Sequence, residues 1–231
     1  MHVKAQLIIP AAGMGVRLGA SEPKALITLA GKPLLVRTLE RFARLRLITN
    51  AIIMIPPGTR ETFQACLSLA FPGNTFRLLD GGAERQDSVA RGLAALEADT
   101  EIVAVHDAAR PFVPLDSVTG SIEAAVVHGA ATVAVRSIDT ILIADGDAFL
   151  CETPDRSVLW ACQTPQVFRV AVLRDAHTRA AKEGFLGTDD ASLVRRAGGR
   201  VKLVTGSPLN FKITTPHDRA LAQCVIEGNL V

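Results

Sequence analysis

The sequence predicts an α/β fold with a mostly parallel sheet and helices on both faces of that sheet. The chain has 231 residues, of which 48% are hydrophobic, and this suits one domain with a sizeable core. Short apolar runs alternate along the chain with longer amphipathic segments. Strands that are apolar throughout are typical of a parallel sheet covered on both faces. We therefore expect a single Rossmann-like domain over residues 1–231.

Each apolar run is short enough to form one buried strand. The predicted strands are residues 5–9, 51–55, 76–79, 101–105, 131–135 and 200–206. The predicted helices are residues 33–45, 60–71, 85–98, 115–129, 169–184, 190–199 and 216–228. Ligands of such sheets bind beyond the carboxyl ends of the strands. The loops that follow the strands, 10–24, 56–59, 80–84, 106–114 and 136–140, are therefore the places to look for a site.

One segment breaks the alternation. Residues 139–156 contain two short strand-like pieces around Asp145-Gly146-Asp147, which is a turn signal for a β-hairpin. An isolated hairpin is not stable in water, so it must pack on the body or on another subunit. We expect a protruding β-hairpin arm over about residues 137–157, although a solvated surface hairpin would give the same pattern.

Composition and charge exclude several classes of protein. The net charge is only +2, which gives no support to nucleic-acid binding. No apolar run approaches the roughly 18 residues that would span a bilayer, and the N-terminal residues do not form a signal peptide. The four cysteines are far apart and the histidines form no close pair, so a zinc site and a disulfide framework are both unsupported. We expect a soluble, cytoplasmic protein that binds neither membrane nor nucleic acid.

The first strand leads into a glycine loop, IPAAGMGVRLG, over residues 9–19. It is not a dinucleotide fingerprint, because Leu18 stands where the third glycine is required. It is not a P-loop either, because no Gly-Lys-Ser/Thr follows. What remains is a glycine loop that carries two cations, Arg17 and Lys24, which could hold phosphate oxygens together with backbone N–H groups. A tight turn with two solvated cations would fit the same spacing.

Further landmarks make a resemblance specific. They are DGGAERQDSV (80–89), VHDAARPFV (105–113), IDTI (138–141), TPQVF (164–168), TDDAS (188–192) and NFKITTPHD (210–218). In this order, and with the glycine loop, they resemble the 2-C-methyl-D-erythritol 4-phosphate cytidylyltransferases, nucleotidyltransferases of non-mevalonate isoprenoid synthesis. The resemblance covers residues 5–226. Ala25 stands where many relatives carry glutamine, beside a residue of the motif but outside its chemistry.

The resemblance implies the reaction. CMP would pass from CTP to the phosphate of methylerythritol phosphate, and pyrophosphate would leave. An anionic phosphate attacks another anionic phosphate, so the barrier is electrostatic and calls for positioned cations rather than a covalent nucleophile. The sequence agrees, since it offers Arg and Lys residues at loop positions but no nucleophile elbow. Mg²⁺, or another divalent cation, is the implied cofactor.

The resemblance also implies a role for particular residues. The catalytic residues would be Arg17, Lys24, Arg156 and Lys212, of which Arg156 and Lys212 position the acceptor phosphate. The nucleotide would lie against Pro10, Ala11, Ala12, Gly13, Gly15, Gly82, Arg85 and Ser88. The acceptor would contact Asp107, Arg110, Thr140, Arg156, Thr188 and Lys212. Asp107 would hold the metal ion or bind substrate hydroxyls.

Some of these residues have simpler explanations. Asp107 could cap the next turn, Arg85 could be a solvated cation at a helix start, and Thr188 could cap the helix that contains DDASL. His106 is expected to be structural, since the reaction needs no neutral base. Two other functions stay open. A ribitol 5-phosphate cytidylyltransferase has a similar scaffold, although such relatives tend to read HDSVRPF and TDAC, and a catalytically silent nucleotide-binding protein could share the fold.

The arm leads to a prediction about assembly. Its apolar side chains would be exposed on a monomer and buried against the same ribbon of a second subunit. The family that the sequence resembles is homodimeric, with an arm that reaches the neighbouring active site. We therefore expect a homodimer in which Thr140, Arg156 and Arg110 serve the partner's acceptor pocket.

Overall fold

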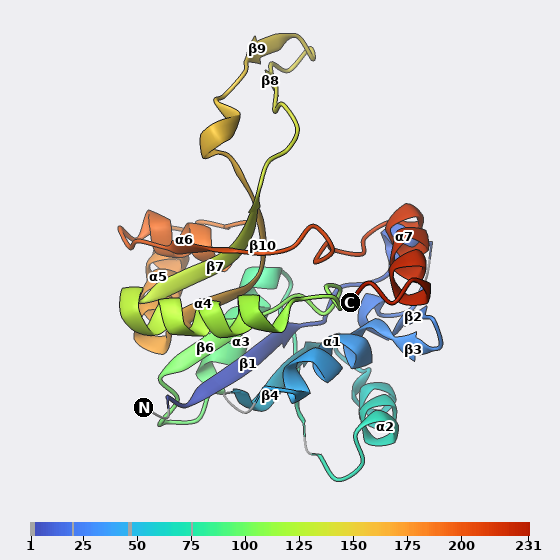
Figure 1. The fold of residues 1–231 in the computed structure, drawn as a ribbon. Coiled ribbons are helices and arrows are strands. Elements are labelled where there is room, and N and C mark those ends of the chain that lie inside the picture. Colours follow the sequence, from blue (N-terminus) through green and yellow to red (C-terminus); the bar gives the residue numbers. More distant parts are fainter. Residues whose placement is uncertain (1–2, 20, 46–47, 75) are drawn as a thin grey trace.

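The computed structural model describes residues 3–19, 21–45, 48–74 and 76–231, and it has the predicted α/β architecture (Figure 1). The main sheet of the described chain consists of β1 (Ala5–Pro10), β4 (Ile48–Ile55), β5 (Arg77–Asp80), β6 (Ile102–Val105), β7 (Ala130–Arg136), β10 (Trp160–Arg169) and β11 (Lys202–Thr205). Their order in the sheet is β11-β7-β10-β6-β1-β4-β5. β1 pairs in parallel with β4 and β6, β4 with β5, and β7 with β11. The predicted mostly parallel sheet is confirmed.

Strand β10 is the part of the sheet that the sequence analysis missed. It lies between β6 and β7 and runs antiparallel to both. Its pairing with β7 shifts register between Cys162 and Gln166, and Pro165 lies inside that irregular stretch. A proline inside a run argues against a central strand, and the sequence analysis assigned no strand there. The register shift places the Thr164 region at the carboxyl end of β6.

Helices cover both faces of the sheet. They are α1 (Leu34–Ala43), α2 (Arg60–Ala70), α3 (Arg85–Ala94), α4 (Leu115–His128), α5 (Val170–Lys182), α6 (Asp190–Arg196) and α7 (Pro216–Glu227). The apolar side chains of α1, α2 and α4 share one buried cluster with Leu7, Ile9 and Ile53. Those of α3, α5 and α6 share another with Ile8, Ile52 and Met54. Successive residues of β1 and β4 thus point to opposite faces, as expected for a strand buried on both sides.

A third, smaller hydrophobic cluster lies beside the glycine loop. It joins α7 to the short ribbon of β2 (Thr28–Leu29) and β3 (Lys32–Pro33), through Leu29, Ala222 and Val225. Ile213 belongs to the same cluster, and its N–H donates to the carbonyl of Ala109. The segment just before α7 is therefore fixed against the loop that follows β6, which brings Lys212 to that edge of the sheet.

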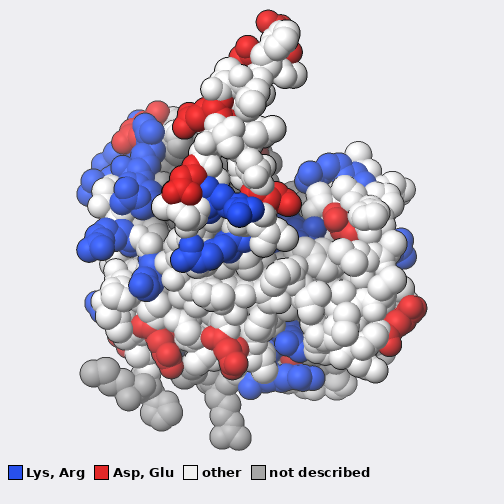
Figure 2. All heavy atoms as spheres, turned by 45° about the horizontal axis from the view of Figure 1, so that its top comes forward, with Lys and Arg blue, Asp and Glu red and all other residues white. Residues whose placement is uncertain are grey.

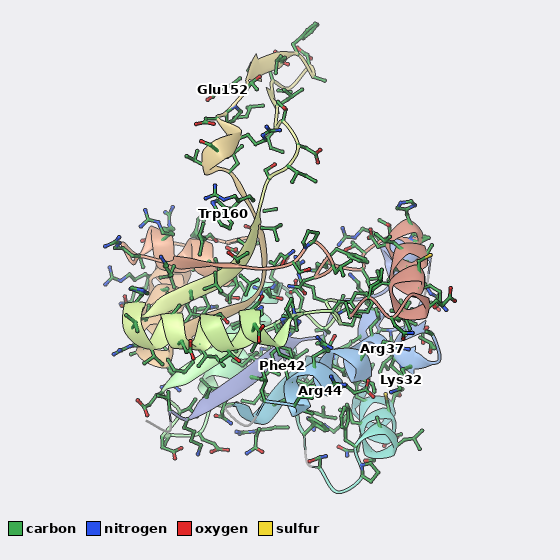
Figure 3. The ribbon with its side chains drawn as sticks, in the orientation of Figure 1. Lys32, Arg37, Phe42, Arg44, Glu152 and Trp160 are labelled. Atoms are coloured by element: carbon green, nitrogen blue, oxygen red, sulfur yellow. The ribbon has the colours of Figure 1, made fainter. Side chains whose placement is uncertain are left out.

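The predicted arm stands out from the body (Figure 1). Its strands β8 (Ile143–Ala144) and β9 (Leu150–Glu152) pair around the predicted turn, where the Asp145 carboxylate accepts the N–H groups of Asp147 and Phe149. At its base Trp160 lies under the guanidinium of Arg136, 4.6 Å from the ring centroid, and Figure 3 shows Trp160 there. Figure 2 shows the arm as a projection with acidic side chains at its tip and further along it.

The geometry of the sheet sets where a site can form. β1, β4, β5 and β6 run parallel, so their carboxyl ends meet at one edge, and the loops beginning at residues 11, 56, 81 and 106 lie together there. This is the edge at which such sheets bind ligands. Among the described residues, no helix has the length and apolar character that crossing a bilayer requires.

Candidate active site

A cavity of about 320 Å³ opens at the carboxyl ends of the parallel strands. Its volume is within the range of small-molecule sites. It is lined by Pro10, Ala11, Ala12, Gly13, Met14, Arg17, Lys24, Ala25, Gly82, Ala83, Glu84, Arg85, Ser88, Asp107, Ala108, Ala109 and Lys212. Loops after β1, β5 and β6 thus contribute to one site, together with the segment before α7.

The glycine loop is held in shape by its own backbone. The N–H of Lys24 donates to the carbonyl of Gly13 at 3.0 Å, and the N–H of Gly15 donates to the carbonyl of Glu22 at 3.0 Å. The two halves of the loop therefore lie side by side, each with a short 3-10 turn: Val16–Leu18 holds Arg17 and Lys24–Leu26 holds Lys24. A Cβ added to Gly13 would have no heavy atom within 4 Å, so the space beside this residue is open to the cavity.

The second glycine loop, after β5, is glycine for a different reason. A Cβ on Gly82 would lie 2.2 Å from the Cβ of Asp87, and one on Gly81 would lie 2.5 Å from the Cβ of Ala12. The close approach packs this loop against the first glycine loop. The Ser88 hydroxyl accepts the N–H of Gly82 at 3.0 Å and donates to the carbonyl of Glu84 at 3.1 Å, which fixes the turn into α3.

Asp107 is the centre of charge of the site. It is buried, and its carboxylate contacts Lys212 Nζ at 3.0 Å, Arg110 Nε at 3.4 Å and Arg85 Nε at 3.6 Å. Burial by itself would raise the pKa of Asp107, but Lys212, Arg85 and Arg110 hold that pKa well below its usual range. Asp107 therefore stays ionised and links Arg110, three residues away, to Arg85 and Lys212, which come from distant parts of the chain.

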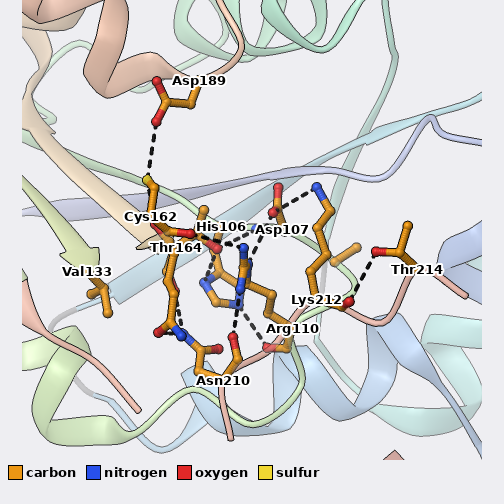
Figure 4. A network of polar contacts seen from close by, with 12 residues as sticks. His106, Asp107, Arg110, Val133, Cys162, Thr164, Asp189, Asn210, Lys212 and Thr214 are labelled. Carbon is orange, nitrogen blue, oxygen red and sulfur yellow. Dashed lines mark hydrogen bonds and ion pairs between the residues drawn. The ribbon is translucent and has the colours of Figure 1, made fainter. Parts of the chain in front are cut away.

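The backbone of Asp107 is held from behind by His106 and Thr164 (Figure 4). The carbonyl of Arg110 lies 3.0 Å from Nε2 of His106, and a carbonyl only accepts, so Nε2 carries the proton. Nδ1 then accepts from the Thr164 hydroxyl at 3.1 Å, and that oxygen accepts the N–H of Asp107 at 3.1 Å. The His106 ring also packs edge-on against Phe42 at 4.8 Å. His106 is thus structural, as the sequence suggested.

This arrangement makes stability depend on pH. Burial lowers the pKa of His106 from 6.5 to about 4. Between these two pH values the imidazole of the unfolded chain is protonated, whereas that of the folded chain is neutral. The free energy of unfolding should therefore fall with pH, by about 2 kcal/mol from His106 alone between about pH 7 and about pH 4.5. Urea unfolding at each pH measures it. The loss should shrink in His106→Gln and persist in His128→Gln, which changes an exposed histidine; equal losses in both would contradict it.

Lys24 and Lys212 give the cavity its positive character. Partial burial, with the like charge of Lys212, lowers the pKa of Lys24 to about 8. A cation that is poorly solvated and faces other cations gains when an anion enters the cavity. The positions of Lys24, Lys212 and Arg17 around one cavity therefore favour a ligand with several negative charges, such as a triphosphate.

Comparison with known proteins agrees with this site. The family model described as 2-C-methyl-D-erythritol 4-phosphate cytidylyltransferase matches residues 5–228. A relative of that name from Symbiobacterium thermophilum is 47% identical over 227 residues, which cover 98% of this chain and 94% of the relative. The chain belongs to this family. It is a cytidylyltransferase by that membership.

Solved structures of the family have the same fold. The 4-diphosphocytidyl-2C-methyl-D-erythritol synthase of Anaerococcus prevotii superposes with a TM-score of 0.87 at 30% identity, covering 98% of this chain and 97% of that chain. The 2-C-methyl-D-erythritol 4-phosphate cytidylyltransferase of Thermus thermophilus gives 0.78 at 38% identity, covering 98% and 100%. The predicted α/β fold class is thereby confirmed over the 98% of the chain that these structures cover.

Most residues that the sequence assigned to this cytidylyltransferase site lie around the cavity. Those that line it are Pro10, Ala11, Ala12, Gly13, Arg17, Lys24, Gly82, Arg85, Ser88, Asp107 and Lys212. Gly15 is a buried residue of the glycine loop and does not line the cavity. Arg110 does not line the cavity, but its guanidinium contacts Asp107 of the same chain and donates to the carbonyl of Asn210 at 2.7 Å. The expectation that Arg110 also serves a neighbouring subunit stays a prediction.

Three other predicted residues lie away from the cavity. Thr140 and Arg156 are exposed on the arm, where Arg156 donates to the carbonyl of Ile138 at 3.0 Å. Thr188 is exposed just before α6, and the prediction that it caps this helix is wrong. The N-cap is the next residue, Asp189, because its carboxylate accepts the N–H of Ser192 at 2.8 Å.

The sequence analysis missed residues that support this site from behind. Thr164 and Asn210 belong to motifs that carried the resemblance, but neither was given a role. The Asn210 amide donates to the carbonyl of Thr164 at 2.9 Å and to the side chain of Gln163 at 3.0 Å. Asp190 is the third, since its buried carboxylate binds Arg85 at 2.7 Å. Their role depends on partners from other segments, which spacing within a motif does not reveal.

Proposed function

We propose that the protein binds CTP in this cavity and transfers its CMP group to the phosphate of 2-C-methyl-D-erythritol 4-phosphate, as a step of isoprenoid precursor synthesis. The observation that carries the proposal is the convergence of two glycine loops and the cations Arg17, Lys24 and Lys212 on one nucleotide-sized cavity. Family membership supplies the two substrates.

The proposed step is a displacement at phosphorus. An oxygen of the acceptor phosphate attacks the α-phosphorus of CTP, the new P–O–P bond forms, and the bond from the α-phosphorus to the pyrophosphate oxygen breaks. Arg17 and Lys24 offset the charge that grows on the α-phosphoryl group and on the leaving pyrophosphate. Lys212, held by Asp107 at 3.0 Å, meets the acceptor phosphate. Arg85 and Ser88 lie at the base and ribose end.

Lys212→Ser should separate the two substrates. If Lys212 meets the acceptor phosphate, the variant raises KM for the polyol phosphate about 10-fold or more, and raises KM for CTP much less. Lys212→Arg should restore little, because a planar fork does not replace a compact ammonium beside Asp107. Steady-state kinetics with each substrate varied in turn measures both constants. Equal increases in the two KM values would place Lys212 on the triphosphate instead.

Gly13→Ala should weaken CTP binding in a protein that folds normally. The added methyl would contact no protein atom, and the backbone of Gly13 is not in a conformation reserved for glycine. The methyl would therefore project into the space that a phosphate needs. We expect CTP affinity, measured by calorimetry, to fall about 10-fold with an unchanged melting temperature. An unchanged affinity would place the triphosphate elsewhere in the cavity.

A divalent cation, Mg²⁺, is the proposed cofactor. Among the described residues no group of three His, Cys, Asp or Glu side chains is arranged to hold a metal, and Asp107 is the buried carboxylate of the cavity. Because Asp107 already faces three cations, the residues fit an ion that arrives with phosphate oxygens and water as its main ligands, with Asp107 as one possible ligand. When bound, Mg²⁺ would neutralise triphosphate charge.

The proposal includes a homodimer formed through the arm over residues 137–157 of this single domain. Apolar side chains are exposed along the arm, among them Ile141, Ile143, Phe149 and Leu150. Pairing with a second copy would cover them, and Arg156 and Thr140 would then be available to the partner's acceptor pocket. A cytoplasmic location is also part of the proposal, and the four unpaired cysteines support a reducing compartment.

The experiment that tests the substrate is a competition. The enzyme receives CTP, Mg²⁺ and an equal mixture of methylerythritol 4-phosphate and ribitol 5-phosphate, and mass spectrometry follows both products. The proposal predicts mainly the methylerythritol product, at a ratio equal to the ratio of the two kcat/KM values. Preferential use of ribitol 5-phosphate would make it the acceptor in place of methylerythritol 4-phosphate. If no pyrophosphate is released with either acceptor, the proposed function is wrong.

A further inference from the structure

A buried carboxylate outside the cavity binds one of the cavity's cations. Asp190, the first residue of α6, has no exposed surface. One of its oxygens binds Arg85 Nη1 at 2.7 Å, and the other lies 3.0 Å from Nε2 of His177 on α5. Neither Asp190 nor His177 lines the cavity. A buried ionised group destabilises a protein unless it is paired, and even a buried ion pair adds little to stability. A role in the function of the site would explain why this pair is present.

We infer that Asp190 is a positioning residue, which with His177 holds the Arg85 guanidinium in place for the nucleotide. The inference rests on the proposed function, because it concerns how CTP meets Arg85. Arg85 is the first residue of α3, so its backbone is fixed by the helix, and Asp190 fixes its far end. His177 occupies the second carboxylate oxygen, which leaves the first one for Arg85.

The segment that carries Asp190 is itself tied to the sheet and to α3. The side-chain oxygen of Gln166, a fully buried residue of β10, accepts the N–H groups of Asp190 at 2.9 Å and Ala191 at 3.1 Å. Gln86, next to Arg85, accepts the N–H of Gly187 at 2.8 Å. The Arg85–Asp190 contact therefore joins two elements that other bonds already hold at a fixed separation, which is what a positioning contact requires.

Arg85 faces a second carboxylate, and this gives Asp190 its effect. The Nε of Arg85 lies 3.6 Å from Asp107, whereas its Nη1 lies 2.7 Å from Asp190. Without the charge of Asp190, the stronger attraction left to Arg85 is Asp107, which also binds Lys212. Asp190 thus limits how closely Arg85 can approach Asp107, the carboxylate that also binds Lys212.

The first test is Asp190→Asn, which keeps the shape and removes the charge. We expect the Kd for CTP, measured by calorimetry, and KM for CTP to rise about 10-fold or more, with a smaller change in KM for the polyol phosphate. Wild-type turnover is measured first. An inactive wild-type protein would refute the proposed function, whereas an active wild type with normal CTP binding in Asp190→Asn would refute this inference alone.

A double-mutant cycle separates positioning from a general structural role. If Asp190 acts through Arg85, then Arg85→Ala/Asp190→Asn should bind CTP as well as Arg85→Ala does, and should be more stable than Arg85→Ala, which leaves a buried charge unpaired. A further loss of CTP affinity in the double variant would mean that Asp190 acts by another route.

Variants of His177 test the inference even if Asp190→Asn does not fold. His177→Gln retains an N–H donor at the position of Nε2 and should stay within about threefold of the wild-type Kd, whereas His177→Phe removes the donor and should weaken CTP binding about 10-fold. The same Kd in both variants, and in the wild type, would overturn the role given to His177 and Asp190.

Discussion

Lys24→Ala is expected to abolish most of the turnover of a protein that still folds. Lys24 lies in the glycine loop, half-buried, beside Arg17 and Lys212, where it would meet charge developing at the α-phosphorus. Loss of one preorganised charge donor costs a factor of about 10²–10³ in kcat. Pyrophosphate release under saturating CTP and polyol phosphate measures it, and a circular dichroism melt confirms the fold. A folded variant with near-normal kcat would remove Lys24 from the mechanism.

Lys32→Ala is the matched control. Lys32 belongs to the same part of the chain, but it is exposed and pairs with Glu40 on α1 at 2.6 Å. This pair is at the surface and is worth little. The control should keep wild-type kcat and both KM values, so that a loss in Lys24→Ala reports the cavity and not the removal of a lysine.

The pH profile gives the same residue a second test. The pKa of Lys24 is about 8 in the free protein, so its positive charge is lost as the pH rises through that value. The kcat/KM for CTP, which reports the free enzyme, should therefore fall above about pH 8. In Lys24→Arg the side chain stays charged, so any remaining activity should lack that falling limb. An unchanged limb in Lys24→Arg would assign the titration to another group.

Mixing two inactive chains should restore activity. One chain carries Arg156→Ala on the arm, and the other carries Lys24→Ala in the cavity. If each site combines one subunit's cavity with the partner's arm, a heterodimer has one intact site and one site with both lesions. Random exchange then gives about one quarter of the wild-type activity, since half of the dimers are mixed and half of their sites are intact.

The opposite outcome of this mixing is equally clear. If Arg156 acts within its own chain, every site keeps one lesion and the mixture stays inactive. A mixture of Lys32→Ala with Lys24→Ala is the reference for this experiment. Its activity comes from the cavities of the active Lys32→Ala chain. A monomeric mass in solution at micromolar concentration would also contradict the shared site. The exposed apolar side chains of the arm, such as Phe149 and Ile143, are the reason to expect a dimer.

The sequence predicted the fold and the cavity where local patterns control the structure. Leu7, Ile8 and Ile9 are all apolar because both faces of the strand are covered, and such runs, with helical segments between them, indicated a buried parallel sheet. The spacing of the glycine loop with Arg17 and Lys24 likewise indicated a phosphate site, although a tight turn with two solvated cations fitted it as well. Both features are local, so a reading of neighbouring residues was sufficient.

What the sequence did not predict depends on contacts between distant segments. Strand β10 escaped because Pro165 interrupts its pattern, and its partners β6 and β7 are remote in the chain. Asp190 was given no role, because only the fold brings Arg85 to within 2.7 Å of it. Thr188 was given the capping role of Asp189, an error of one residue that is common where both side chains can accept an N–H.

The most direct test of the central claim is the stoichiometry of transfer. The wild-type protein is incubated with CTP, Mg²⁺ and methylerythritol 4-phosphate. Pyrophosphate and the polyol product, in which CMP is joined to the phosphate of methylerythritol phosphate, are measured together. We predict one pyrophosphate per product molecule, dependent on both substrates, retained in Lys32→Ala and nearly lost in Lys24→Ala. Pyrophosphate without the polyol product, or full transfer by Lys24→Ala, would contradict the account of this cavity as the site of CMP transfer.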